Sequence, residues 1–135
     1  MQSKPPTKKP PDGPHKQYFT DGKLSCSGGY QHGKKHGLWK YYLYNGRVKA
    51  AGRFNNGEFA GLWKWWRSNG ELLQVGKFEE NKKVGLWKRY HPNGKLMDEG
   101  KFKDGKKAGE WKLYDKNGKL RSTKKYVAKP PMKKA

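Results

Sequence analysis

The sequence predicts an all-β protein: an elongated single-layer antiparallel sheet, arranged as a meander of five tandem 24-residue β-hairpin repeats, with disordered basic tails. Three observations support this fold class. Glycine and aromatic motifs recur at a constant spacing, and Asn-Gly pairs recur at the same spacing. Aliphatic side chains are also scarce, because only 32% of the residues are hydrophobic, so a thick two-layer core is not expected.

The repeat is defined by a Gly-x-Trp motif that occurs four times at steps of 24 residues, with its tryptophans at Trp39, Trp63, Trp87 and Trp111. Asn-Gly pairs follow at the same step, at 45–46, 69–70, 93–94 and 117–118. Gly-basic-Phe units follow in turn, at 52–54, 76–78 and 100–102. A degenerate first unit has His15 in the Trp column, Asp21-Gly22 in the turn column and Tyr30 in the Phe column.

Each unit is predicted to be a β-hairpin. Asn-Gly between two β-prone segments indicates a type I′ turn, because both central residues of that turn need positive φ. In the second unit the predicted strands are 38–44 and 47–54, and a second turn at 55–58 leads into the next unit. The chain should therefore grow by two strands per repeat.

A two-residue turn at Asn45-Gly46 sets the hairpin register, because the numbers of paired residues then sum to 91. Trp39 is predicted to lie opposite Gly52, where its ring would cover the exposed glycine backbone. The predicted structural core consists of Trp39, Trp63, Trp87, Trp111, Gly52, Gly76, Gly100, Phe54, Phe78 and Phe102. Period-two alternation places one further apolar column on the same face: Val48, Leu72, Leu96 and Leu120.

The opposite face is predicted to be basic and aromatic, stepping about 9.5 Å per repeat. It is the predicted partner-binding surface and carries Lys40, Lys64, Lys88, Lys112, Tyr42, Trp66, Tyr90, Tyr114, Arg53, Lys77 and Lys101. The net charge of +21 exceeds what solubility usually requires and favours an acidic contact. The alternative is a solvated face whose lysine stems shield the tyrosine rings.

These motifs together resemble the MORN repeat, in particular the variant found in YwqK-like antitoxin components. The shared signature is G-x-W-x-x-Y-x-x-N-G-x-L-x-x-x-G-x-F, seen here from Gly85 to Phe102, and the resemblance extends over roughly residues 13–126. It implies a sheet of hairpins used for assembly, partner docking or lipid contact, without catalytic residues. The antitoxin resemblance implies a cognate toxin as the partner.

A single repeat domain is predicted at residues 13–126, with units at 13–36, 37–60, 61–84, 85–108 and 109–126. Flexible Lys/Pro-rich segments, 1–12 and 127–135, flank it. Proline prevents regular strand pairing and favours extended, solvated chain. These tails are expected either to order on an acidic partner or to act only as solubilising segments.

No catalytic, metal or cofactor site is predicted, since the glycines punctuate repeats and form no phosphate-binding loop. His32 and His36 lie in sequence near Cys26, but they span an inter-hairpin turn, so they are expected to be ordinary solvated residues. Trp65 and Trp66 break the pattern of their columns. They are the better candidates for stacking on a ligand.

The sequence thus predicts a non-enzymatic interaction or scaffold module that docks an acidic protein partner, such as a toxin or a larger assembly. Two alternatives remain: sequence-nonspecific nucleic-acid binding through the Lys/Tyr face and the tails, and binding to an anionic membrane surface. No apolar run approaches the roughly 20 residues of a transmembrane segment. The lone Cys26 and the absence of a secretory signal favour a cytoplasmic location.

Overall fold

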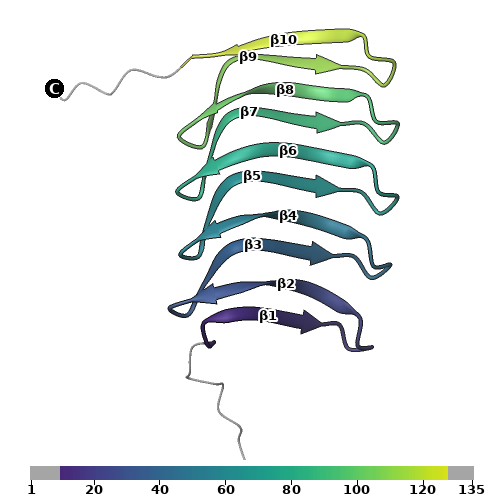
Figure 1. Cartoon of the computed structure of the whole chain (residues 1–135). Coiled ribbons are helices and arrows are strands. Elements are labelled where there is room, and N and C mark those ends of the chain that lie inside the picture. The colour runs from purple at the N-terminus through teal and green to yellow at the C-terminus, as the bar shows by residue number, and fades with distance from the viewer. Residues whose placement is uncertain (1–9, 128–135) are drawn as a thin grey trace, which may run out of the picture.

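The computed structural model describes residues 10–127, which form one open antiparallel sheet of ten strands (Figure 1). The strands are β1 (Gly13–Tyr18), β2 (Leu24–Gln31), β3 (Lys34–Tyr42), β4 (Val48–Asn55), β5 (Glu58–Trp66), β6 (Leu72–Glu79), β7 (Lys82–Tyr90), β8 (Leu96–Lys103), β9 (Lys106–Tyr114) and β10 (Leu120–Tyr126). Their order in the sheet is their order in the chain, so the predicted all-β meander is confirmed. The predicted flexible segments fall largely outside the described residues. No helix that could span a membrane is found within residues 10–127.

The turns inside the hairpins differ from the predicted type I′ turn. In the second hairpin the Gly46 N–H donates to the Leu43 carbonyl at 2.9 Å, and the Leu43 N–H donates to the Arg47 carbonyl at 2.7 Å. Gly46 has a φ of 88°, whereas Asn45 keeps a negative φ. These features describe a three-residue loop, a type I turn followed by a left-handed glycine. The two-residue type I′ prediction for Asn45-Gly46 is therefore wrong.

Type I′ turns occur instead between the hairpins. Asn56 and Gly57 have φ values of 49° and 85°, and they connect the paired residues Asn55 and Glu58. Two successive positive φ values in a two-residue loop define this turn type, whose twist matches that of the strands. The same pattern occurs at residues 32–33, 80–81 and 104–105. The repeats are therefore joined by the tightest turns in the sheet.

The predicted register is confirmed, although the turn on which it rested is wrong. Trp39 pairs with Gly52, and the equivalent pairs form in the next two hairpins. The three-residue loop pairs Tyr42 with Val48, and the extra residue Lys49 then bulges out of the ladder and restores the predicted sum. The extra residue in the loop and the bulge at Lys49 therefore compensate for each other, and the strand register beyond the bulge is the predicted one.

The bulge moves one apolar column to the other face of the sheet. Val48 pairs with Tyr42, which alternation places on the face opposite Trp39. The same pairing holds for Leu72 with Trp66, Leu96 with Tyr90 and Leu120 with Tyr114. The prediction that Val48, Leu72, Leu96 and Leu120 share the tryptophan face is wrong, because it assumed unbroken alternation through the bulge.

The prediction that the Trp39 ring covers Gly52 is wrong, because each indole ring covers a glycine of the preceding hairpin and not its own cross-strand partner. Gly61 has a φ of 67° and forms a bulge, which sets Gly61, Leu62 and Trp63 across from the single residue Gly52. A Cβ atom built on Gly52 would lie 2.1 Å from Cδ2 of Trp63. Trp39, Trp87 and Trp111 cover Gly28, Gly76 and Gly100 in the same way.

The core is an aromatic ladder on one face of the sheet, which we call the Trp face. Its buried residues are Cys26, Trp39, Ala50, Phe54, Trp63, Phe78, Trp87 and Trp111. The rings of Phe54 and Trp63 meet edge to face with centroids 5.1 Å apart. The Trp63 Nε1–H donates to the Arg53 carbonyl at 2.9 Å. Each tryptophan therefore joins its hairpin to the one before it by packing and by a hydrogen bond.

Candidate partner-binding surface

The face opposite the Trp face, which we call the basic face, carries the predicted partner-binding residues in three rows. The first row crosses the sheet through successive paired residues: Ser27, Lys40, Ala51, Lys64, Val75, Lys88, Glu99, Lys112 and Thr123. A lysine therefore recurs on every second strand, at a spacing of about 9.6 Å. Three of these lysines are exposed, and Lys88 is half-buried. Small or apolar residues separate them until Glu99.

The second row adds cations and exposed leucines. Arg53, Lys77 and Lys101 are all exposed. They pair with Leu38, Leu62 and Leu86, whose side chains are 53%, 56% and 48% exposed. This leucine column was not among the predicted surface residues, although each leucine precedes a core tryptophan and alternation alone places it on this face. The basic face thus offers apolar contacts beside its positive charges.

The third row is aromatic and half-buried, and it consists of Tyr42, Trp66, Tyr90 and Tyr114. Tyr114 Oη donates to Glu99 Oε2 at 3.0 Å. Burial raises the pKa of Tyr114, and the hydrogen bond and negative charge of Glu99 raise it further. Within the first two rows the acidic residues are Glu99 and Glu110, so both lie towards the C-terminal end. The uninterrupted positive charge therefore lies over β3 to β7.

The two tryptophans considered as ligand candidates lie on opposite faces. Trp65 packs on the Trp face between Trp63 and Trp87, with ring centroids 5.9 Å and 5.7 Å away. Trp66 lies in the third row of the basic face and pairs with Leu72. Trp65 and Trp66 therefore do not form one site. Trp65 packs within the aromatic ladder, between Trp63 and Trp87.

The three residues considered as zinc ligands, Cys26, His32 and His36, lie in separate surroundings. His32 lies in a type I′ turn, and His36 Nδ1 accepts a hydrogen bond from the Asn56 N–H at 3.4 Å. Cys26 is buried, and its thiol donates to Gln17 Oε1 at 3.2 Å. Over the part of the chain that the structure describes, no three His, Cys, Asp or Glu side chains gather as metal ligands.

The Trp face also carries lysines that were not among the predicted site residues. The amino groups of Lys35, Lys83 and Lys107 lie 4.9, 4.8 and 4.6 Å from the ring centroids of Trp39, Trp87 and Trp111. These distances are typical of cation–π contacts. In the remaining copy the same position is Phe59. The Trp face is therefore not wholly apolar, because lysine side chains lie over three of its tryptophan rings.

Comparison with known families finds the MORN repeat variant at residues 83–104 and 107–128. No curated protein matches the chain significantly. Among solved structures, similarity is found to a chain of the "Crystal structure of GtfA/B complex bound to UDP and GlcNAc", at 14% identity and a TM-score of 0.38. The alignment covers 67% of this chain but 22% of that one, and so weak a likeness supports no functional argument. The last two hairpins thus match the MORN repeat variant, whose repeats generally serve as non-enzymatic interaction or scaffold modules.

Proposed function

We propose that the protein is an interaction module that docks an acidic protein partner through the basic face. The main observation behind this proposal is the pair of cationic rows. A cation occupies the positions equivalent to Lys40 and to Arg53 in the second, third and fourth hairpins. Like charges on neighbouring hairpins repel, and an acidic partner would relieve that repulsion. The MORN repeat match at residues 83–104 and 107–128 supports a docking role.

The exposed leucines favour a protein over a nucleic acid as the partner. Leu38, Leu62 and Leu86 are about half exposed and lie beside the cations of the second row. A protein interface combines an apolar centre with charged groups at its rim. A phosphate backbone offers the leucines no apolar contact, and non-specific affinity for it comes from the cations. Burial of these leucines against apolar side chains therefore favours a protein over a nucleic acid as the partner.

The resemblance to antitoxin components narrows the proposal further. It makes the partner a cognate toxin, or a larger assembly, with an acidic patch that faces the lysine rows. We place this contact in the cytoplasm, because the chain has a single cysteine, Cys26, which is buried and free.

The test compares two triple variants with the same change in net charge. Lys40→Gln, Lys64→Gln and Lys88→Gln remove three cations from the basic face, whereas Lys35→Gln, Lys83→Gln and Lys107→Gln remove three from the Trp face. Partner capture is measured after nuclease treatment, and affinity is measured with the purified partner. We expect about tenfold weaker binding for the basic-face variant only, at roughly 0.5 kcal/mol per exposed charge.

Three outcomes would contradict the proposal. Equal loss in both triple variants would show that net charge matters and the face does not. Capture that disappears on nuclease treatment, with a log–log salt slope that shrinks in the basic-face variant, would indicate nucleic-acid binding. Sedimentation with anionic vesicles, without any protein partner, would indicate a membrane surface.

A further inference from the structure

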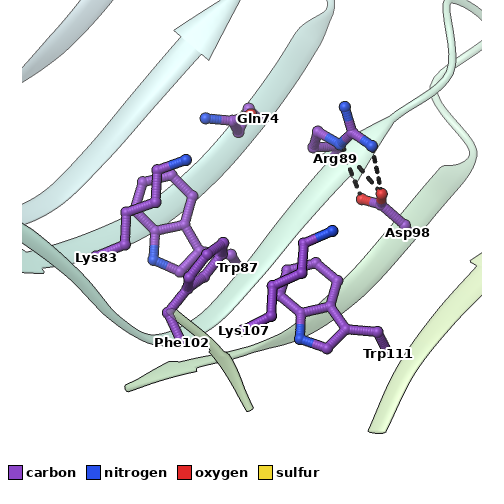
Figure 2. Close-up of a pocket in the computed structure, with 8 residues that line it drawn as sticks. All are labelled: Gln74, Lys83, Trp87, Arg89, Asp98, Phe102, Lys107 and Trp111. Atoms are coloured by element: carbon purple, nitrogen blue, oxygen red, sulfur yellow. Dashed lines mark hydrogen bonds and ion pairs between the residues drawn. The ribbon is translucent and has the colours of Figure 1, made fainter. Parts of the chain in front are cut away.

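A shallow pocket of about 190 Å³ lies on the Trp face, away from the proposed docking surface (Figure 2). The rings of Trp87 and Trp111 form its floor, and Lys83, Arg89, Asp98 and Lys107 stand around it. These side chains come from β7, β8 and β9. The pocket therefore spans the boundary between the fourth and fifth hairpins.

The pocket exists because one position departs from the pattern of the earlier repeats. In the second hairpin this position is Tyr41, whose ring stacks on Trp39 at a centroid distance of 6.1 Å, and in the third it is Trp65. In the fourth hairpin it is Arg89, which turns to Asp98 and donates from Nε at 3.0 Å. Phe102 still contacts both Trp87 and Trp111, but no aromatic ring at position 89 packs beside it, and a hollow remains.

The charges around the hollow do not balance. Arg89 and Asp98 neutralise each other through a two-pronged ion pair. Within residues 10–127, the amino groups of Lys83 and Lys107 have no hydrogen bond and no ion pair. In the second hairpin the equivalent Lys35 donates to Tyr41 Oη at 2.9 Å. The pocket therefore presents two ammonium groups that contact aromatic rings but have no hydrogen-bond acceptor, whereas the equivalent Lys35 has one.

The two indole rings at the floor of the pocket have no free N–H group with which to bind a ligand. The Trp87 and Trp111 Nε1–H groups both donate to backbone carbonyls of the preceding hairpin, those of Lys77 and Lys101, each at 3.1 Å. Trp87 and Trp111 are 3% and 9% exposed, so the indoles supply only a small apolar contact, and the lysines supply the donors. A ligand that fits must combine negative charge with a short apolar body.

We propose that this pocket binds a small free dicarboxylate of four or five carbons. Its two carboxylates would accept hydrogen bonds from the ammonium groups of Lys83 and Lys107, which start from strands about 9.6 Å apart. Its methylene groups would lie between the two lysine side chains, against the small exposed parts of the Trp87 and Trp111 rings. A hollow of about 190 Å³ is smaller than the roughly 300–1,000 Å³ of pockets that hold drug-sized ligands, so a nucleotide would not fit.

The test is a titration of the full chain with disodium glutarate, followed by the indole N–H resonances in ¹H–¹⁵N NMR spectra at constant ionic strength. We expect saturable shifts of the Trp87 and Trp111 resonances and none at Trp39, whose surroundings lack the hollow. The neutral isostere glutaramide should leave all three resonances unchanged. Equal shifts with glutaramide, or at Trp39, would overturn the proposal.

Two further probes separate other anions from a free dicarboxylate. Inorganic phosphate that binds more tightly than glutarate would show a phosphate site and refute the dicarboxylate. A glutamate residue capped at both ends stands in for an acidic side chain of a partner. Binding of this probe as tightly as glutarate would show that the pocket takes a protein side chain, and it too would refute the proposal.

Variants then test the residues. Lys83→Gln with Lys107→Gln should weaken glutarate binding at least tenfold, since a charge-assisted hydrogen bond contributes about 1.5–3 kcal/mol. Lys35→Gln removes one charge from the same face and should leave the affinity unchanged. Arg89→Tyr with Asp98→Ala transplants the Tyr41–Ala50 pair of the second hairpin, and it should fill the hollow and abolish binding. Unchanged binding in either double variant would disprove the assignment. None of these outcomes depends on the basic face.

Discussion

The contact between Trp63 and Gly52 predicts that Gly52→Ala is strongly destabilising. The new Cβ atom would lie 2.1 Å from Cδ2 and 2.3 Å from Cε2 of the indole, against an ordinary contact of at least 3.4 Å. The ring must therefore retreat by about 1.3 Å, the difference between these distances. Trp63 is 1% exposed, so the ring cannot move aside freely within the packed ladder.

The expected loss follows from three contributions. Overpacking costs about 1–3 kcal/mol. Stretching the bond from Trp63 Nε1 to the Arg53 carbonyl, now 2.9 Å long, costs about 1 kcal/mol more. Replacing a strand glycine by alanine returns about 0.5–1 kcal/mol, because the unfolded chain loses freedom. The net expectation is a decrease of about 1–3.5 kcal/mol in the free energy of unfolding.

The assay is urea unfolding followed by far-ultraviolet circular dichroism, carried out as a double-mutant cycle. Trp63→Ala removes every side-chain atom beyond Cβ, including Cγ, which would lie 2.4 Å from the new methyl group. In that background Gly52→Ala no longer meets the indole, so its cost should fall to zero or become a small gain. If Gly52→Ala is as costly with alanine at position 63 as with tryptophan, the steric account of the repeat is refuted.

Two further predictions concern charged groups. Arg89→Ala leaves the Asp98 carboxylate, 7% exposed, without its partner and should lower the free energy of unfolding by about 1–3 kcal/mol, whereas adding Asp98→Ala should recover most of the loss in the same urea assay. Glu99→Gln should lower the raised pKa of Tyr114 in an absorbance titration; an unchanged titration would mean that Glu99 does not contribute. Because folding raises this pKa, the stabilisation is complete below the ordinary value of 10.0 and is lost as the pH rises through the folded-state pKa.

The strand order and register could be predicted from the sequence because the repeat spacing is constant. The turn types could not, because Asn-Gly occurs in both kinds of loop. Gly46 closes a three-residue loop and Gly57 a two-residue loop, and the dipeptide alone does not fix the loop length. The predicted register is nevertheless correct, because the bulge at Lys49 compensates for the longer loop.

The lysine rows could be placed from alternation, but the contacts of the tryptophans could not. Trp63 lies between Gly52 on one neighbouring strand and Gly76 on the other, and both are small enough to be covered. The choice of Gly52 follows from the left-handed bulge at Gly61, which period-two alternation does not contain. The pocket near Arg89 was missed for a related reason, since it requires knowing that Tyr41 and Trp65 fill the equivalent space.

The placement of each indole on the preceding hairpin gives the ladder a direction. The Trp87 ring packs on Gly76, which lies earlier in the chain. Gly76 has no such contact with any hairpin that follows the one containing Trp87. During synthesis each new hairpin would therefore find its seat already formed, so the sheet can grow from the N-terminus without waiting for the rest of the chain. Removing the last hairpin exposes the glycine that its tryptophan covered. Removing the first hairpin instead leaves the tryptophan of the next hairpin without the glycine on which it packs.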